Sequence, residues 1–298
     1  MFENLYKKYR DSDVVGKYIF VNVALYVLLL FIGVFSVLFN AGTLSADVLS
    51  FVELPASLGE LALRPWTVFT YMFIHAGLWH ILWNMFALYF FGRIFLNFYS
   101  VRHFVGIYIL GGLFGALFFV LAYNLFPYFG PYLPFSRLVG ASAAVLAIVV
   151  AAAVRSPQYR INLMFVGSVK LSTFALVVVA MSFLMLSGEN AGGNFAHLGG
   201  AFAGWLVADM LNKGKDLTLV VNGPIDWMSS LLTRLRTPRK KKTKFTYTRG
   251  GRSADYEYNA RKKADEAEVD RILEKVKKGG YASLSEEEKR RLFEASSK

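Results

Sequence analysis

The chain has 298 residues, of which 55% are hydrophobic and only 18% are charged, a balance that excludes an ordinary soluble domain of this size and predicts a membrane protein. Its net charge of +12 does not indicate a nucleic-acid partner, because 22 of the 33 Lys and Arg residues and 13 of the 21 Asp and Glu residues lie from Lys213 onward. The absence of Cys excludes disulfides, thiolate catalysis and Cys-based metal sites.

The first apolar run, residues 18–39, contains 22 residues without a charge. At about 1.5 Å per residue this length crosses a hydrocarbon core of about 30 Å. No small-residue cleavage pattern follows it, so we expect a retained membrane anchor and not a signal peptide. Residues 40–78 contain two Pro and are only half apolar, which predicts a partly embedded first loop.

Further spans are expected at about residues 77–92, 104–126, 140–154, 171–186 and 192–208. The sequence therefore predicts an all-α polytopic membrane protein with a bundle of six transmembrane helices. The segment 140–154 has only 15 residues, which is about 22 Å as a helix and too short to span unaided. We expect this short central helix to begin below the outer surface, surrounded by its neighbours.

The orientation follows from the basic residues of the short loops, which are enriched on the cytoplasmic side. One side carries Lys7, Lys8, Arg10, Lys17, Arg93, Arg102, Arg155 and Arg160, whereas the other carries only Arg64 and Arg137. Both termini are therefore expected in the cytoplasm of a multi-pass protein, in the bacterial cytoplasmic (inner) membrane.

The composition changes at Lys213, which divides the chain into a membrane domain, residues 1–212, and a basic cytoplasmic tail, residues 213–298. The tail pattern predicts an interfacial helix over 225–236, followed by a basic run that faces anionic lipid. That run is Arg239, Lys240, Lys241, Lys242 and Lys244. Residues 245–261 are expected to be disordered, and 264–278 and 285–295 to form two short helices, the second with a capping box of Ser285 and Glu288.

Three of the four histidines, His75, His80 and His197, lie in or beside membrane segments, where ionisable residues are functional candidates. His80 and Asn84 are one helical turn apart, so their side chains share a face and can converge on one oxygen atom.

Ser142 lies near the start of the short helix that opens at Gly140, where backbone N–H groups lack intrahelical partners and the helix dipole favours negative charge. An oxyanion beside Ser142 would be stabilised there, with His80 and Asn84 as further donors. His197 supplies the base that a serine nucleophile requires. Asp209 lies too far along the helix to orient His197, and Glu189 is a solvated loop charge, so the pattern predicts a dyad.

Gly200 and Gly204 follow His197 at small-xxx-small spacing, which permits close approach of another helix backbone. If that partner is the Ser142 helix, the serine and the histidine come within hydrogen-bond distance.

The motifs that carry this chemistry span about residues 61–209. They are Phe73-Ile74-His75, His80-Ile81-Leu82-Trp83-Asn84-Met85, Gly140-Ala141-Ser142-Ala143, and Ala196-His197-Leu198-Gly199-Gly200 with Gly204. In this order they resemble the rhomboid intramembrane serine proteases. The resemblance implies Ser142 as nucleophile, His197 as base, and the Ser142 N–H, His80 and Asn84 as the oxyanion hole, with His75 as a structural histidine. The chain departs from the common family pattern at Ala143, Leu146 and Thr67.

Several other functions are disfavoured. A zinc protease needs a His-Glu-x-x-His helix, and no acid lies between His75 and His80. An aspartyl protease needs two membrane aspartates, and a proton transporter would not explain Ser142. The remaining alternative is a catalytically inactive rhomboid-like protein that binds and escorts transmembrane helices. We expect no cofactor and no metal, and transmembrane proteins in the bilayer as substrates.

Overall fold

A computed structural model describes residues 2–164, 166–236 and 252–296 of the chain. The fold is mostly helical, at 76%. The chain divides into two compact units, residues 1–236 and 237–298. The first unit carries all the candidate site residues.

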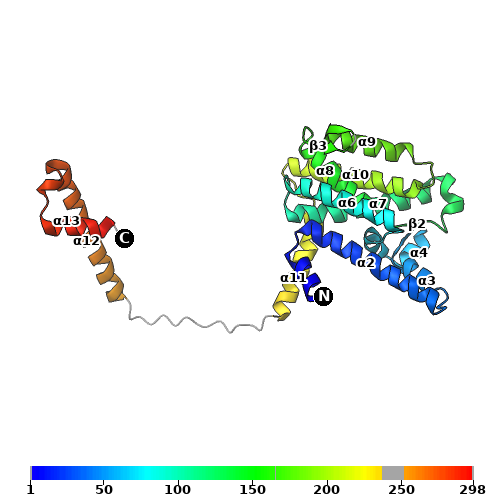
Figure 1. The fold of residues 1–298 in the computed structure, drawn as a ribbon, viewed down its shortest axis with the longest axis horizontal. Coiled ribbons are helices and arrows are strands. Elements are labelled where there is room, and N and C mark those ends of the chain that lie inside the picture. The colour runs from blue at the N-terminus through cyan, green and yellow to red at the C-terminus, as the bar shows by residue number, and fades with distance from the viewer. Residues whose placement is uncertain (1, 165, 237–251, 297–298) are drawn as a thin grey trace. The chain divides into compact units, whose positions relative to one another are not determined.

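Six helices of the first unit lie over the six apolar segments predicted from the sequence (Figure 1). They are α2 (Val14–Leu38), α6 (Leu78–Leu96), α7 (Val101–Leu125), α8 (Ser142–Arg155), α9 (Leu171–Leu184) and α10 (Ala191–Asn212). Helices α2 and α7 are long and apolar enough to cross a membrane, and α8 and α9 are shorter apolar helices.

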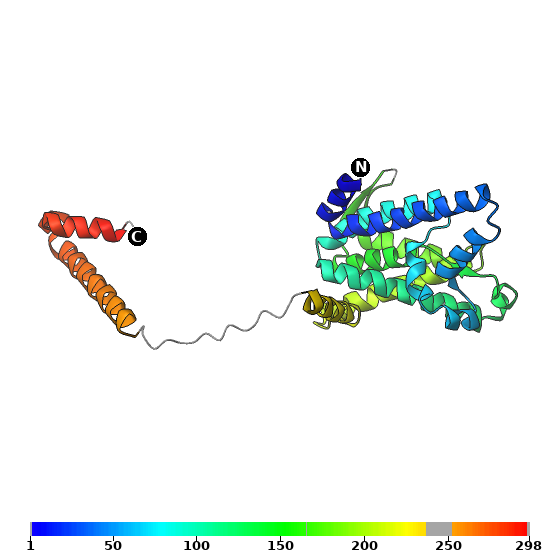
Figure 2. The same cartoon turned by 90° about the horizontal axis from the view of Figure 1, so that it is seen from below.

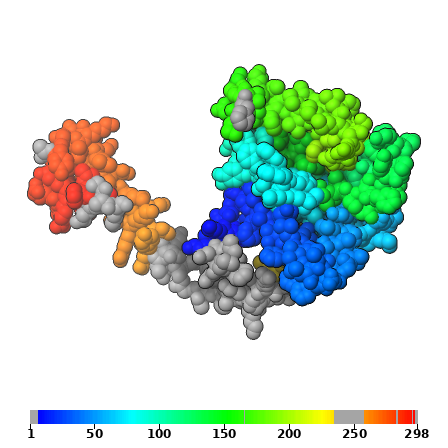
Figure 3. All heavy atoms as spheres, turned by 45° about the vertical axis from the view of Figure 1, so that its right-hand side comes forward, coloured from blue at the N-terminus to red at the C-terminus, as the bar shows by residue number. Residues whose placement is uncertain are grey.

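Helix α8 forms the centre of this bundle, with ten of its 14 residues buried. Its run of Ala residues lets neighbouring helices come close. Figure 1 shows α2 and α9 along opposite edges, with α8 and α10 between them. In α9 only three of 14 residues are buried, and its green surface lies on the outside of the unit in Figure 3. An apolar helix exposed in this way suits contact with lipid.

The first loop is more ordered than the sequence predicts. It folds into α3 (Leu44–Val52), β1 (Leu54–Pro55), α4 (Leu58–Leu63), α5 (Thr67–Thr70) and the 3-10 helix η1 (Tyr71–Phe73). Strand β1 pairs antiparallel with β2 (Arg137–Leu138), with Leu54 opposite Leu138. The loop is thus tied to the segment that leads into α8.

The remaining elements of the first unit are the N-terminal helix and the connections between long helices. They are α1 (Phe2–Asp11), η2 (Pro127–Tyr132), and the antiparallel hairpin of β3 (Arg160–Leu163) and β4 (Gly167–Lys170).

Glycines allow α10 to contact the backbone of α8. A Cβ atom built on Gly200 would lie 2.1 Å from the carbonyl oxygen of Ala143, and one on Gly204 would lie 2.3 Å from that of Ala147. Real Cβ contacts are never this short, and the obstructing atoms are backbone atoms that have no rotamer to change. These two positions therefore set the distance between the helix that carries His197 and the helix that carries Ser142.

Gly200→Ala is expected to destabilise the bundle by about 2 kcal/mol or more, because overpacking a tight contact forces the helices apart. Gly33→Ala on α2 is the matched control, since the nearest atom to its added Cβ is 3.8 Å away. Helical Gly→Ala at such an open site is neutral or stabilising. Thermal unfolding in detergent measures both variants, and equal stability would contradict the close contact.

Helix α11 (Leu219–Arg236) belongs to the first unit, although the composition places a boundary before it. Thr218 is fully buried, and its side chain lies against Gly106 of α7. The amide nitrogen of Asn222 donates to the carbonyl oxygen of Arg102 at 3.0 Å, and Arg102 pairs with Asp226. The helix begins earlier than the predicted 225–236, and the basic run from Arg239 lies outside the described residues.

The second unit is a helical hairpin of α12 (Arg252–Gly279) and α13 (Glu286–Ser296), joined through the 3-10 helix η3 (Tyr281–Ser283) (Figures 1 and 2). The prediction of disorder over 245–261 is therefore wrong for residues 252–261, and residues 245–251 lie outside the described part. Ile272 and Leu284 are its buried apolar residues.

The predicted capping box of α13 is confirmed. The backbone N–H of Ser285 donates to the Glu288 carboxylate at 2.8 Å, and the N–H of Glu288 donates to the Ser285 hydroxyl at 3.3 Å. The Lys275 ammonium on α12 also donates to Glu288, at 2.9 Å. These bonds, from Lys275 first and Ser285 second, lower the pKa of Glu288 to about 2, so its contacts are fully formed at neutral pH.

Candidate active site

Ser142 is the first residue of α8, and the segment before it is held in place by a glycine. Gly140 has φ +119°, which L side chains rarely adopt, and a Cβ atom there would lie 2.7 Å from His80 Nε2. Its N–H donates to the carbonyl oxygen of Tyr71 at 3.0 Å. The helix therefore begins at Ser142 and not at Gly140 as predicted, which leaves the Ser142 N–H among the donors without intrahelical partners.

His197 of α10 contacts this serine directly. Ser142 Oγ lies 2.8 Å from His197 Nε2, a normal hydrogen-bond distance. The contact joins residues from two helices whose backbones meet at Gly200 and Ala143. A histidine nitrogen at this distance can accept the hydroxyl proton, which is the arrangement that activates a serine for nucleophilic attack.

The neighbours of His80 on α6 indicate which of its ring nitrogens carries the proton. His80 Nδ1 accepts the backbone N–H of Ala76 at 3.4 Å, so in the neutral ring the hydrogen is on Nε2. A Cβ on Gly140 would lie 2.7 Å from this Nε2 and 3.9 Å from Ser142 Oγ. His80 Nε2 and Ser142 Oγ therefore both lie close to the backbone of Gly140.

Asn84 is one turn further along α6 and is buried. Its amide nitrogen donates to the backbone oxygen of His80 at 2.9 Å. That bond fixes the orientation of the amide and uses one of its two hydrogens, so the other remains a donor. Ser142 thus contacts His197 directly, His80 Nε2 lies near the backbone of Gly140, and Asn84 is bonded to the backbone of His80.

A scan against family models matches residues 62–214 to the Rhomboid domain and residues 252–298 to a family of unknown function, DUF6576. The chain belongs to the rhomboid family. Rhomboid proteins are generally intramembrane serine proteases. A comparison with curated proteins gives no match. The family and the apolar helices together identify an integral membrane protein.

His75 of this rhomboid lies next to His80. It lies in the turn between η1 and α6, is only 4% exposed, and its ring centroid is 5.1 Å from that of His80. Burial, with a smaller contribution from His80, lowers the pKa of His75 to about 4, so the ring is neutral at pH 7. Within the described residues His75 does not reach Ser142 by any hydrogen bond.

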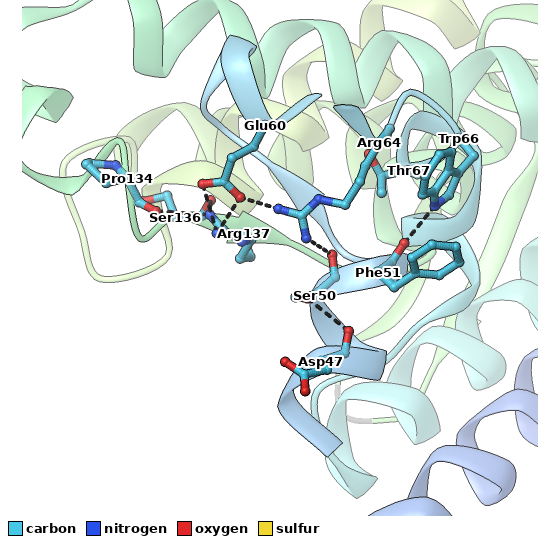
Figure 4. A network of polar contacts seen from close by, with 10 residues as sticks. All are labelled: Asp47, Ser50, Phe51, Glu60, Arg64, Trp66, Thr67, Pro134, Ser136 and Arg137. Atoms are coloured by element: carbon cyan, nitrogen blue, oxygen red, sulfur yellow. Dashed lines mark hydrogen bonds and ion pairs between the residues drawn. The ribbon is translucent and has the colours of Figure 1, made fainter. Parts of the chain in front are cut away.

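A polar network in the first loop of the rhomboid domain holds the segment before Ser142 (Figure 4). The Glu60 carboxylate of α4 accepts from Arg137 of β2 at 2.8 Å and also pairs with Arg64. Arg64 in turn donates to the carbonyl oxygen of Ser50 on α3. The ion pairs therefore connect the first loop to β2, which precedes Gly140 in the chain.

Thr67, where the chain departs from the common family pattern, is part of this network. Thr67 is fully buried, and its hydroxyl donates to the carbonyl oxygen of Arg64 at 2.7 Å. Trp66 donates its indole N–H to Phe51 at 2.7 Å. The loop is thus anchored by Arg64 and Trp66, with Thr67 as a local cap.

Sequence reasoning missed one residue of the site. Ser182 of α9 lies 3.2 Å from His197 Nδ1. The signal was a hydroxyl near the C-terminal end of a mostly apolar helix that also carries Ser172 and Thr173 at its start, and no motif or spacing relates Ser182 to His197. In the part of the chain that the structure describes, no three acidic, histidine or cysteine side chains gather as a metal site would require.

Proposed function

We propose that this rhomboid is an intramembrane serine endopeptidase that hydrolyses peptide bonds in or near transmembrane segments of other membrane proteins. The observation that carries the proposal is the 2.8 Å contact between Ser142 Oγ and His197 Nε2 inside the helical bundle. A partly buried serine–histidine pair with neighbouring hydrogen-bond donors is the arrangement that acyl transfer requires.

In the proposed mechanism the Ser142 hydroxyl gives its proton to His197 Nε2 while Oγ bonds to the carbonyl carbon of the substrate. The carbonyl oxygen becomes an oxyanion, which accepts from the Ser142 N–H, His80 Nε2–H and the Asn84 amide. The imidazolium then protonates the leaving amine, the C–N bond breaks, and an acyl-enzyme remains. Water, deprotonated by His197, attacks the acyl carbon and restores Ser142.

The membrane arrangement is also part of the proposal. We place helices α2, α6, α7, α8, α9 and α10 in the cytoplasmic membrane of a bacterium, with both termini in the cytoplasm, because the basic loop residues gather on one side. A substrate helix has its backbone groups paired internally, so cleavage requires local unwinding beside the serine. Suitable substrates are membrane helices with Gly, Pro or polar residues near their outer ends.

The test is incubation of the purified chain, in detergent and in liposomes, with a labelled transmembrane segment of that kind. Cleavage within the segment is expected, with mass spectrometry locating the cut. Binding of the segment without cleavage would instead support the alternative, an inactive rhomboid-like protein that escorts transmembrane helices.

The second unit is proposed to be dispensable for chemistry. Truncation after Arg236 is expected to retain cleavage in detergent, because every residue of the site and all of α11 remain. Truncation after Lys215 is the comparison, since it removes Thr218 and Asn222, which bind α7. That shorter form should be less stable to heat and less active. Loss of activity on truncation after Arg236, with the bundle still folded, would show that the hairpin contributes to the active state.

A further inference from the structure

The second ring nitrogen of His197 has a partner on a different helix. Ser182 Oγ of α9 lies 3.2 Å from His197 Nδ1 and 3.1 Å from the carbonyl oxygen of Val178, one turn earlier in α9. The Ser182 side chain therefore lies between one nitrogen and one carbonyl oxygen, each within hydrogen-bond distance of its hydroxyl.

Ser182 occupies a position where an apolar residue would be expected. The three buried residues of α9 are Leu171, Ala175 and Ser182, which are spaced along one face of the helix and pack into the bundle. Ser182 is only 5% exposed. Burying a hydroxyl costs free energy unless it is hydrogen-bonded, so both of its bonds matter at this site.

The hydrogen positions between Ser142, His197 and Ser182 follow from how many hydrogens each side chain can donate. If His197 Nε2 is to accept the Ser142 proton, the ring hydrogen must be on Nδ1. Nδ1–H then donates to Ser182 Oγ, and the single hydroxyl hydrogen of Ser182 donates to the Val178 oxygen. In the Nε2–H tautomer, Nδ1 and the Val178 oxygen are both acceptors, so the single Ser182 hydrogen can bond only one of them. Ser182 therefore makes one more hydrogen bond when His197 is in the tautomer that a base requires.

We propose that Ser182 is a positioning residue that holds His197 in its Nδ1–H tautomer and supports the imidazolium that forms when Ser142 loses its proton. The proposal rests on the Ser142–His197 dyad of the proposed function. Ser182 would thus be the residue that orients the imidazole through Nδ1, a role for which neither Asp209 nor Glu189 is suited. A neutral hydroxyl suits this site, because a carboxylate would carry a large cost of burial among apolar helices.

The test compares Ser182→Ala, Ser182→Thr and the matched control Ser172→Ala in the full chain. Ser172 is on the same helix and donates to the carbonyl oxygen of Pro157 at 2.8 Å, far along α9 from Ser182. Alanine is the best helix former, so Ser182→Ala keeps α9 helical. Two measurements are made on each variant: kcat and KM for a transmembrane substrate, and the ¹⁵N chemical shifts of the His197 ring, assigned by loss of its signals in His197→Ala.

Ser182→Ala is expected to lower kcat about three- to tenfold with KM unchanged, the rate equivalent of one neutral hydrogen bond. Its ¹⁵N spectrum should show a mixture of tautomers, whereas wild type and Ser172→Ala show the Nδ1–H form. Ser182→Thr restores the hydroxyl and with it the Nδ1–H signal.

A Ser182→Ala spectrum identical to wild type would overturn the proposal, whether or not the rate fell, because a purely structural role does not change the tautomer. Failure of the dyad itself is a separate result, seen as cleavage by Ser142→Ala or as an inactive wild-type chain. The ¹⁵N measurement needs no turnover, so it tests Ser182 in either case.

Discussion

Ser142→Ala and His197→Ala should each lower kcat by about 10⁴-fold or more, with the helical bundle still folded. Each substitution removes one half of the 2.8 Å contact through which, in the proposed mechanism, the proton is transferred during attack. Groups that act as one unit in catalysis have strongly non-additive effects. The double variant is therefore expected to be no less active than either single variant, as measured by cleavage of a labelled transmembrane segment.

Matched controls separate chemistry from folding. Ser156→Ala changes a serine at the opposite end of α8. His103→Ala changes the remaining histidine, which lies on α7 with its Nε2 atom 3.4 Å from the Asp216 carboxylate. Both should keep near wild-type kcat. If Ser142→Ala retained comparable turnover instead, the proposed serine mechanism would be wrong.

His80→Ala and Asn84→Ala are expected to lower kcat by about 10² to 10³-fold each with little change in KM, the typical loss for one oxyanion donor. The reason is that the oxyanion exists only in the transition state and the tetrahedral intermediate. Steady-state kinetics on a soluble or detergent-dispersed substrate separates the two constants.

Asn97→Ala is the control for this pair, because Asn97 caps the opposite end of α6. Asn84→Asp is a sharper variant, since it keeps the shape of the side chain but places a negative charge beside the oxyanion. It should be at least as damaging as Asn84→Ala. Unchanged kcat in Asn84→Ala, with weaker substrate binding alone, would assign the amide to substrate contact instead.

Periodicity and apolar length locate the long helices well, because a span of uncharged residues has few alternatives in a bilayer. The start of α8 was misplaced by two residues for a tertiary reason. Gly140 is drawn out of the helix by its bond to Tyr71, a residue far away in sequence. The domain boundary at Lys213 follows from the rise in charged residues there. The charge pattern does not reveal that Thr218 and Asn222 contact α7 and so attach α11 to the first unit.

Sequence spacing could relate those candidate site residues that share a helix. His80 and Asn84 are one turn apart, and Gly200 lies within one turn of His197, so helical geometry relates them. Ser182 had no such relation, because it reaches His197 from a neighbouring helix across a loop. The ion pair of Glu60 with Arg64 is four residues apart in sequence, so helical spacing predicts it. The ion pair of Glu60 with Arg137 joins distant segments, so spacing does not predict it.

The central claim, that Ser142 is a nucleophile activated by His197, is tested most directly by covalent labelling. A serine-directed phosphonate forms a bond only with an activated hydroxyl. Mass spectrometry of the treated wild-type chain should find a single adduct on the peptide that contains Ser142, and almost none in Ser142→Ala or His197→Ala. Labelling of another residue, or undiminished labelling of Ser142 in His197→Ala, would contradict the account.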